Sequence, residues 1–128
     1  MKLKHAAGAL ALITVFFVHG DASWKRVFMK QIRFAPGRTT AIRHGTMRQT
    51  DYVDYRLDAK AGQLMIVHLT VRHGKGRFQV GAVKGPGPYK AADMVNDWQG
   101  TLTISGRHLI ILYADSRRLD YTLEITIR

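Results

Sequence analysis

The sequence contains no cysteine and only three prolines. The absence of cysteine excludes disulfide bonds, thiolate zinc sites, a cysteine nucleophile and a lipid-modified N-terminal cysteine. Side-chain packing and hydrogen bonds between strands must therefore hold the fold together. The chain has 128 residues, of which 46% are hydrophobic and 23% charged, a composition typical of a folded globular protein. This length predicts one domain at most and excludes a catalytic cleft between two domains.

Acidic residues are also scarce. Nine Asp and Glu stand against 20 Lys and Arg, which gives a formal net charge of +11 at pH 7 and a pI near 10.5. A surface of this charge attracts anions, which could be nucleic acid, anionic lipid or polysaccharide, or an acidic protein. Charge alone does not distinguish among these partners.

No hydrophobic run is long enough to span a membrane. The run from Ala6 to Val18 has 13 residues, whereas a transmembrane helix needs about 20. It follows the basic residues Lys2 and Lys4 and precedes the small residues Gly20 and Ala22, an order typical of a secretory signal peptide. We therefore expect a signal peptide that is cleaved near Ala22.

Cleavage there assigns residues 1–22 to the signal peptide and leaves a single domain at residues 23–128. The loss of Lys2, Lys4 and Asp21 leaves 18 basic and 8 acidic residues, so the exported domain keeps a net charge of +10. We expect this domain to be periplasmic or secreted. Export argues against a nucleic-acid partner, although the charge and the size would suit one.

Hydrophobic periodicity predicts an all-β fold. Apolar and polar residues alternate from Tyr52 to Ala59 and from Asp120 to Arg128, as in strands with one buried face. Two nearly continuous apolar segments, 63–71 and 108–114, predict strands that are covered on both faces or lie at the centre of a sandwich. The two prolines within residues 85–89 should end a strand, and we expect a polar loop to follow. About seven to eight short strands separated by turns indicate a small antiparallel β-sandwich or a jelly-roll-like barrel.

The residues that catalysis or metal binding would need are absent or unsuitably spaced. No serine after the predicted cleavage site lies in a G-x-S-x-G motif. His68 and His73 are five residues apart, and odd spacing on a strand directs side chains to opposite faces, so the two could not share a metal ion. Asp54 and Asp58 would lie about 13 Å apart on one strand face, too far for the paired carboxylates of a glycosidase. We therefore expect no enzyme, no metal and no cofactor.

Five segments follow one another in an order that is typical of one protein family. They are residues 55–63 with the hydrophobic strand after them, the Gly85-Pro86-Gly87 turn, the Ser105-Gly106 turn before an apolar strand, the arginines Arg117 and Arg118, and the alternating strand that begins at Tyr121. In this order they resemble the periplasmic inhibitors of goose-type (g-type) lysozyme, over roughly residues 51–128. The first segment also occurs in the related pre-peptidase C-terminal β-sandwich domains. The resemblance implies a small β-sandwich that plugs the substrate cleft of a lysozyme with loop residues and so protects peptidoglycan.

The resemblance also implies which residues bind the partner. Ser105 and Gly106 match a serine–glycine turn of the family, and Arg117 or Arg118 matches an arginine at the lysozyme contact. The family has a tyrosine two residues after the start of that turn, where this chain has Arg107 and then His108. The candidate partner-binding residues are therefore Ser105, Gly106, Arg107, His108, Arg117 and Arg118. A straight strand between the two turns would hold them about 20 Å apart, so the two groups should lie at opposite ends of the sandwich.

Two functional hypotheses follow. The first is an exported, non-enzymatic inhibitor of a lysozyme, with a g-type enzyme as the first choice, because guanidinium groups suit the carboxylates of a lysozyme cleft. The second is an envelope- or carbohydrate-binding accessory module that holds anionic polymers or lipids by distributed positive charge. Basic residues gathered at one end would favour the first hypothesis, and an even distribution would favour the second.

Overall fold

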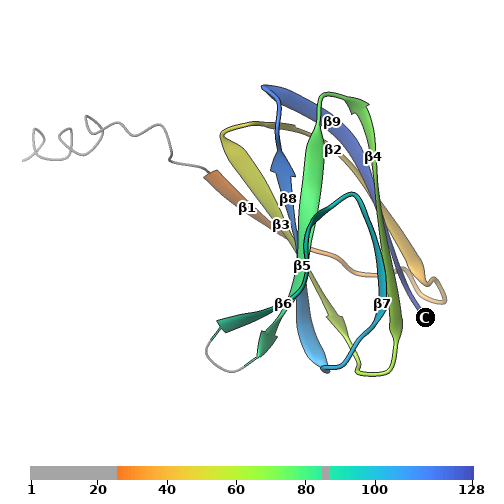
Figure 1. The fold of residues 1–128 in the computed structure, drawn as a ribbon. Coiled ribbons are helices and arrows are strands. Elements are labelled where there is room, and N and C mark those ends of the chain that lie inside the picture. The colour runs from red at the N-terminus through yellow and green to blue at the C-terminus, as the bar shows by residue number, and fades with distance from the viewer. Residues whose placement is uncertain (1–25, 85–86) are drawn as a thin grey trace, which may run out of the picture.

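The computed structural model describes residues 26–84 and 87–128. The predicted signal peptide and its cleavage site lie outside these residues. The described residues form nine strands in two facing layers (Figure 1). The strands are β1 (Arg26–Gln31), β2 (Thr40–Arg48), β3 (Asp51–Ala59), β4 (Leu64–His73), β5 (Gly76–Lys84), β6 (Gly87–Val95), β7 (Asp97–Thr101), β8 (Gly106–Ala114) and β9 (Arg118–Ile127). Within the described ranges, no helix is long and apolar enough to cross a membrane.

The strands divide into a five-stranded and a four-stranded sheet. The five-stranded sheet has the order β1-β3-β8-β5-β6, and the four-stranded sheet has the order β2-β9-β4-β7. Neighbouring strands are antiparallel except for β1, which runs parallel to β3. The sheets share no strand in the part of the chain that the structure describes, so they form an open sandwich and not a closed barrel. The predicted all-β sandwich is confirmed.

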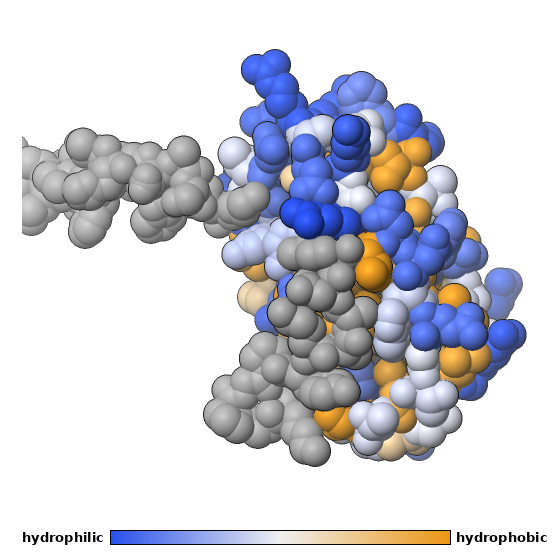
Figure 2. All heavy atoms as spheres, in the orientation of Figure 1, coloured by the Kyte–Doolittle hydropathy of each residue, from blue (hydrophilic) through white to orange (hydrophobic). Residues whose placement is uncertain are grey.

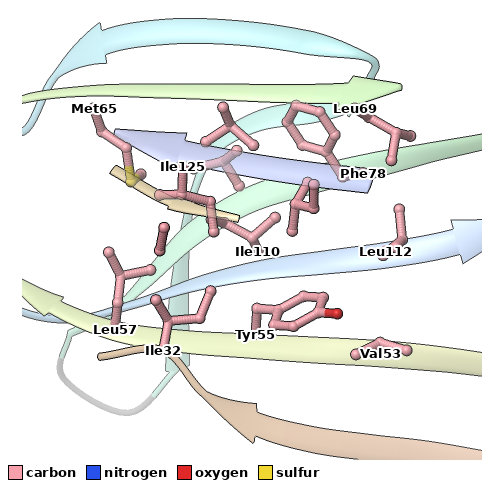
Figure 3. Packing of buried hydrophobic residues seen from close by; sticks show 14 of the residues in the cluster. Ile32, Val53, Tyr55, Leu57, Met65, Leu69, Phe78, Ile110, Leu112 and Ile125 are labelled. Atoms are coloured by element: carbon pink, nitrogen blue, oxygen red, sulfur yellow. The ribbon is translucent and has the colours of Figure 1, made fainter. Parts of the chain in front are cut away.

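Apolar side chains from the inner faces of both sheets fill the space between the layers (Figure 3). Burying one large apolar side chain contributes about 1.5–3 kcal/mol to stability. Because the chain has no cysteine, this layer carries the main stabilising contribution. Its largest fully buried members are Tyr55, Leu57, Met65, Val67, Phe78, Val80, Ile110, Leu112, Leu119, Tyr121, Leu123 and Ile125.

The alternating segments form strands with one buried face, as predicted. In β3, Val53, Tyr55 and Leu57 are buried between the sheets. In β9, burial alternates in the same way up to Ile127. A shift of one residue along either strand would turn its apolar face toward solvent, so this pattern defines the register of the central strands.

Segment 63–71 forms a strand at the centre of the sandwich, which is the second of the two alternatives that its continuous apolar sequence allowed. Met65 and Val67 of β4 are buried against the other sheet, whereas His68 and Thr70 on the outer face are exposed. The strand therefore lies within the sandwich but is covered on one face only, because no further layer of described residues packs against the four-stranded sheet.

The prediction of a polar loop after the prolines is wrong. Residues 87–95 form β6, which pairs with β5 and places Pro88 opposite Val83. Proline cannot donate a backbone hydrogen bond, but β6 is the outermost strand of its sheet and needs donors on one side only. The register between the two strands shifts between Phe78 and Gly81, an irregularity that is common at sheet edges.

Phe78 offers a test of the core. We expect Phe78→Ala to lower the free energy of unfolding by about 3–5 kcal/mol, because it leaves a cavity at a position with no solvent exposure. Ile42→Ala is the matched control: Ile42 is 49% exposed, and its truncation should cost less than about 1 kcal/mol. Urea denaturation measures both changes. Equal losses in the two variants would contradict this assignment of the core.

Candidate functional site

The two groups of candidate residues lie at opposite ends of the sandwich. Strand β8 begins at Gly106 and ends at Ala114, and it pairs with β3 and β5 along this length. Its nine residues span about 27 Å. We call the end with Ser105 the serine–glycine end and the end with Arg117 and Arg118 the arginine end; they lie at the bottom and the top of Figure 1. One narrow cleft therefore cannot hold both turns.

At the serine–glycine end, Ser105 joins two turns. Its hydroxyl oxygen accepts a hydrogen bond from the backbone N–H of Ala61, 2.9 Å away, in the turn between β3 and β4. Gly106 follows with a φ of 126°, which residues with a side chain rarely adopt. A Cβ built on Gly106 would meet no atom within 4 Å. The backbone of this turn is therefore open to a partner.

His108 points into the protein. It is 3% exposed, and its Nδ1 lies 2.9 Å from the carbonyl oxygen of Gly106. A carbonyl oxygen only accepts hydrogen bonds, so Nδ1 carries the hydrogen and donates it. The partner-binding role that we expected for His108 does not fit this position, because successive residues of β8 face opposite sides. Arg107 faces outward, is exposed, and forms no ion pair with a described residue.

At the arginine end, the β4–β5 turn and the β8–β9 turn are hydrogen-bonded to each other. The backbone N–H of Lys75 donates to the Ser116 hydroxyl oxygen at 2.9 Å, and the N–H of Asp115 donates to the Lys75 carbonyl at 2.8 Å. The Ser116 hydroxyl in turn donates to the Arg118 carbonyl at 2.8 Å. Gly74 approaches so closely that a Cβ on it would lie 2.1 Å from that carbonyl oxygen. The two turns thus form one fixed unit, which we call the turn pair.

The two arginines of the turn pair have different surroundings. Nε and Nη2 of Arg118 each donate to a carboxylate oxygen of Asp120, at 3.0 Å in both cases. Asp120 also accepts a hydrogen bond from the Thr46 hydroxyl, and this bond, with those from Arg118, holds the pKa of Asp120 below its usual value. Arg117 is exposed, and its side chain has no ion pair or hydrogen bond with a described residue. Arg117 is therefore the arginine that can bind a partner's carboxylate without giving up an existing contact.

Further exposed basic side chains surround the turn pair. Arg72 and Lys75 are exposed at this end, and its acidic residues Asp51, Asp115 and Asp120 are each paired with an arginine. Figure 2 shows hydrophilic side chains over the turns at the top of the molecule. The arginine end therefore carries an excess of unpaired positive charge.

The serine–glycine end is basic as well, but it is hollowed. Arg38, Lys60 and Arg107 are exposed there, and Asp58 lies opposite Arg107 in the strand register. Arg38, Asp58, Lys60 and Ser105 help to line a recess of about 490 Å³. Positive charge is thus not confined to one end, which by charge alone favours the envelope-binding hypothesis. The shape of each end and the pairing of its side chains must therefore distinguish the two ends.

Two histidines of the four-stranded sheet, His44 and His68, contact side chains on neighbouring strands. Nδ1 of His68 on β4 contacts the Asp97 carboxylate on β7, and Nδ1 of His44 on β2 lies 2.9 Å from the Thr122 hydroxyl on β9. Among the described residues, no group of three or more His, Cys, Asp or Glu could hold a metal ion.

Comparison with solved structures tests the predicted resemblance to the inhibitors of g-type lysozyme. The chain matches the crystal structure of Aeromonas hydrophila PliG, a periplasmic lysozyme inhibitor of g-type lysozyme, with a TM-score of 0.71 and 26% identity over 81% of this chain and 99% of that chain. The resemblance to these inhibitors is confirmed. PliG from Salmonella Typhimurium matches with a TM-score of 0.61 and 18% identity over 79% of this chain and 98% of that chain. A PliG mutant from Escherichia coli matches with a TM-score of 0.58 and 22% identity over 80% of this chain and 99% of that chain. Both show the same fold as this chain. No family model and no curated protein sequence matches the chain.

The turn pair was not predicted from the sequence. Lys75 and Ser116 are 41 positions apart, and nothing in either turn indicates the other. The positive φ of Gly74 suits a turn, but its tight contact with the Arg118 carbonyl depends on how two hairpins meet. A glycine in the sequence therefore indicates a turn conformation, but it does not indicate which part of the chain will lie against that turn.

Gly74 and Gly62 form a matched pair for testing the turn pair. Both have positive φ, 90° and 94°, but a Cβ on Gly62 would meet nothing within 4 Å. Gly62→Ala should cost only the backbone strain, about 1–2 kcal/mol of unfolding free energy. Gly74→Ala adds the clash and should cost about 3 kcal/mol or more, measured by urea denaturation. Equal costs would show that the close approach at Gly74 does not exist in solution.

Proposed function

We propose that this chain is a non-enzymatic inhibitor that binds a g-type lysozyme, blocks its substrate cleft and so protects peptidoglycan. One observation carries the proposal: the likeness to the A. hydrophila inhibitor covers 99% of that protein, at 26% identity and a TM-score of 0.71. The shared unit is thus the whole inhibitor domain and not a fragment of it. Occlusion of a cleft needs binding alone, so it requires no catalytic group on this chain.

Binding through the arginine end suits the chemistry of the target. Most enzymes that hydrolyse glycosidic bonds carry a pair of carboxyl groups in the cleft. Arg117 offers a guanidinium with no described partner, and such a group can bind one carboxylate through two parallel hydrogen bonds. Arg72 and Lys75 add positive charge nearby, which speeds the encounter with an acidic surface.

The fixed turn pair also favours this end. Its hydrogen bonds through Ser116 and Lys75 hold the turns in one conformation, so little conformational freedom is lost on binding. At the serine–glycine end, Ser105 and Gly106 line a recess, so they are less suited to entering a partner's cleft. Ser105, Gly106 and Arg107 remain the candidate contacts of a second surface.

Charge reversal at each end tests the proposal and the choice of end together. At a one-to-one ratio we expect the purified protein to inhibit a g-type lysozyme in an assay of bacterial cell-wall lysis. Arg117→Glu should weaken inhibition at least about tenfold, because an attraction to the cleft carboxylates becomes a repulsion. Arg107→Glu is the matched control, since it makes the same charge change at the other end, and it should leave inhibition nearly unchanged.

Three outcomes would contradict parts of this proposal. Undiminished activity of g-type, chicken-type and invertebrate-type lysozymes would reject the inhibitor function. Loss of inhibition in Arg107→Glu alone would move the contact to the serine–glycine end. Pull-down by peptidoglycan or lipopolysaccharide that weakens steeply with salt, without any inhibition, would support the envelope-binding module.

We also propose that residues 1–22 direct export and are removed near Ala22, which leaves the domain in the periplasm. The basic, apolar and small-residue order of this segment supports the proposal. Intact mass spectrometry of the protein released from the periplasm should show a chain that begins near Ser23. A full-length chain retained in the cytoplasm would contradict this assignment.

A further inference from the structure

A slot lies between the outer edges of the two sheets. β1 is the last strand of the five-stranded sheet, β2 is the last strand of the four-stranded sheet, and side chains from both line a hollow of about 510 Å³. Small-molecule sites typically have volumes of about 300–1,000 Å³. We call this hollow the β1–β2 slot. It contains none of the candidate lysozyme contacts.

Gly45 leaves room for a tyrosine at the floor of the slot. It lies opposite Tyr121 in the pairing of β2 with β9, and both residues line the slot. A Cβ on Gly45 would lie 2.6 Å from the Tyr121 hydroxyl oxygen. The missing side chain thus allows the phenol to lie against β2 and to reach the slot.

The Tyr121 hydroxyl at the floor of the slot is hydrogen-bonded to the Tyr55 hydroxyl, and only one of their two hydrogens is used in that bond. The hydroxyl oxygens of Tyr121 and Tyr55 are 2.7 Å apart, and Figure 3 shows Tyr55 within the buried layer. Burial raises the pKa of both phenols, so both keep their hydrogens at neutral pH. The hydrogen bond between them uses one hydrogen, and no described residue accepts the other. A buried donor without an acceptor is unfavourable, so the floor suits a ligand that brings an acceptor oxygen.

The rim of the slot is positively charged. Arg26 is paired with Asp51 at 3.1 Å, whereas Lys30 and Arg48 are exposed and form no ion pair with a described residue. All four side chains line the slot, so it has a net charge of +2 from three cations and one carboxylate. An anionic group is therefore favoured over a neutral or a cationic one.

The walls of the slot are apolar. Phe28 is 41% exposed on β1, and its ring lies 5.4 Å from the guanidinium carbon of Arg26. Met47 and Val53 are buried behind it. An exposed aromatic ring in a slot whose rim also carries the cations Lys30 and Arg48 suits a ligand with both a hydrocarbon part and an acid group.

We propose that the β1–β2 slot binds a single-chain anionic amphiphile. The hydrocarbon chain packs against Phe28, and the acid group binds Lys30 and Arg48 at the rim. The tyrosine pair donates its spare hydrogen to an oxygen of the ligand. The slot contains none of the candidate lysozyme contacts, although its rim residue Arg48 pairs in the strand register with Arg118 at the arginine end.

Amphiphiles that share one chain length separate the contributions of charge and hydrocarbon. Titrated below their micelle-forming concentrations into the purified domain and followed by NMR, dodecanoate and dodecyl phosphate should both bind and shift the resonances of Phe28 and Lys30. Dodecyl maltoside and dodecyltrimethylammonium should not. Affinity for the two anions should fall as salt is added. Tighter binding of one anion would tell a carboxylate ligand from a phosphate ligand.

A matched pair of lysine variants locates the site. Lys30→Glu should weaken dodecanoate binding by about tenfold or more, because it replaces an attraction with a repulsion. Lys60→Glu makes the same charge change at the serine–glycine end and should have no effect. Both positions are exposed, so both variants should fold. Lysozyme inhibition measured on Lys30→Glu should be unchanged, which separates failure of this proposal from failure of the proposed function.

Equal binding of all four dodecyl compounds, or equal affinity in the two lysine variants, would overturn the proposal. The first result would indicate non-specific hydrophobic contact, and the second would place the ligand elsewhere. No binding of either anion at millimolar concentration would overturn it as well.

Discussion

The burial of two sheet faces against each other is the constraint on which the rest of this structure depends. No disulfide can hold the layers together, so the free energy that offsets the loss of chain entropy comes from the inner apolar side chains. Leu57 and Ile110 of one sheet and Met65 and Leu123 of the other lose all contact with solvent in this layer. Because the side-chain period of a strand is two, this burial also fixes the register and therefore the position of every turn.

A sandwich built in this way has ends made of turns and sides made of strand edges, and each offers different chemistry. At both ends a serine hydroxyl joins turns that are distant in sequence: Ser105 binds the turn at Ala61, and Ser116 binds the turn at Lys75. At the sides, the last strands leave backbone and side chains uncovered, which produces the slot between β1 and β2. The proposed lysozyme contact and the proposed ligand site thus lie on neighbouring surfaces, since Arg48 of the slot pairs in the strand register with Arg118 of the arginine end.

Pairing separates the arginines of this basic surface into different roles. Arg118 is bound to Asp120, and Arg77 is bound to Asp115, so these side chains help to hold the turn pair. Arg117 has no such bond to a described residue and remains available to a partner. The high net charge is thus less informative than the identity of the few cations that the fold leaves unpaired.

Local pattern was sufficient to predict the all-β class, the buried faces of the strands at residues 52–59 and 120–128, and the family resemblance, because alternation and turn residues are properties of neighbouring positions. It was insufficient for β6, because whether a proline is tolerated depends on which strand becomes the edge of a sheet. It also misplaced His108, whose inward direction follows from the register of β8. The turn pair, the freedom of Arg117 and the slot above Tyr121 were decided only by the tertiary structure, since each depends on residues far apart in sequence that meet when the two sheets close.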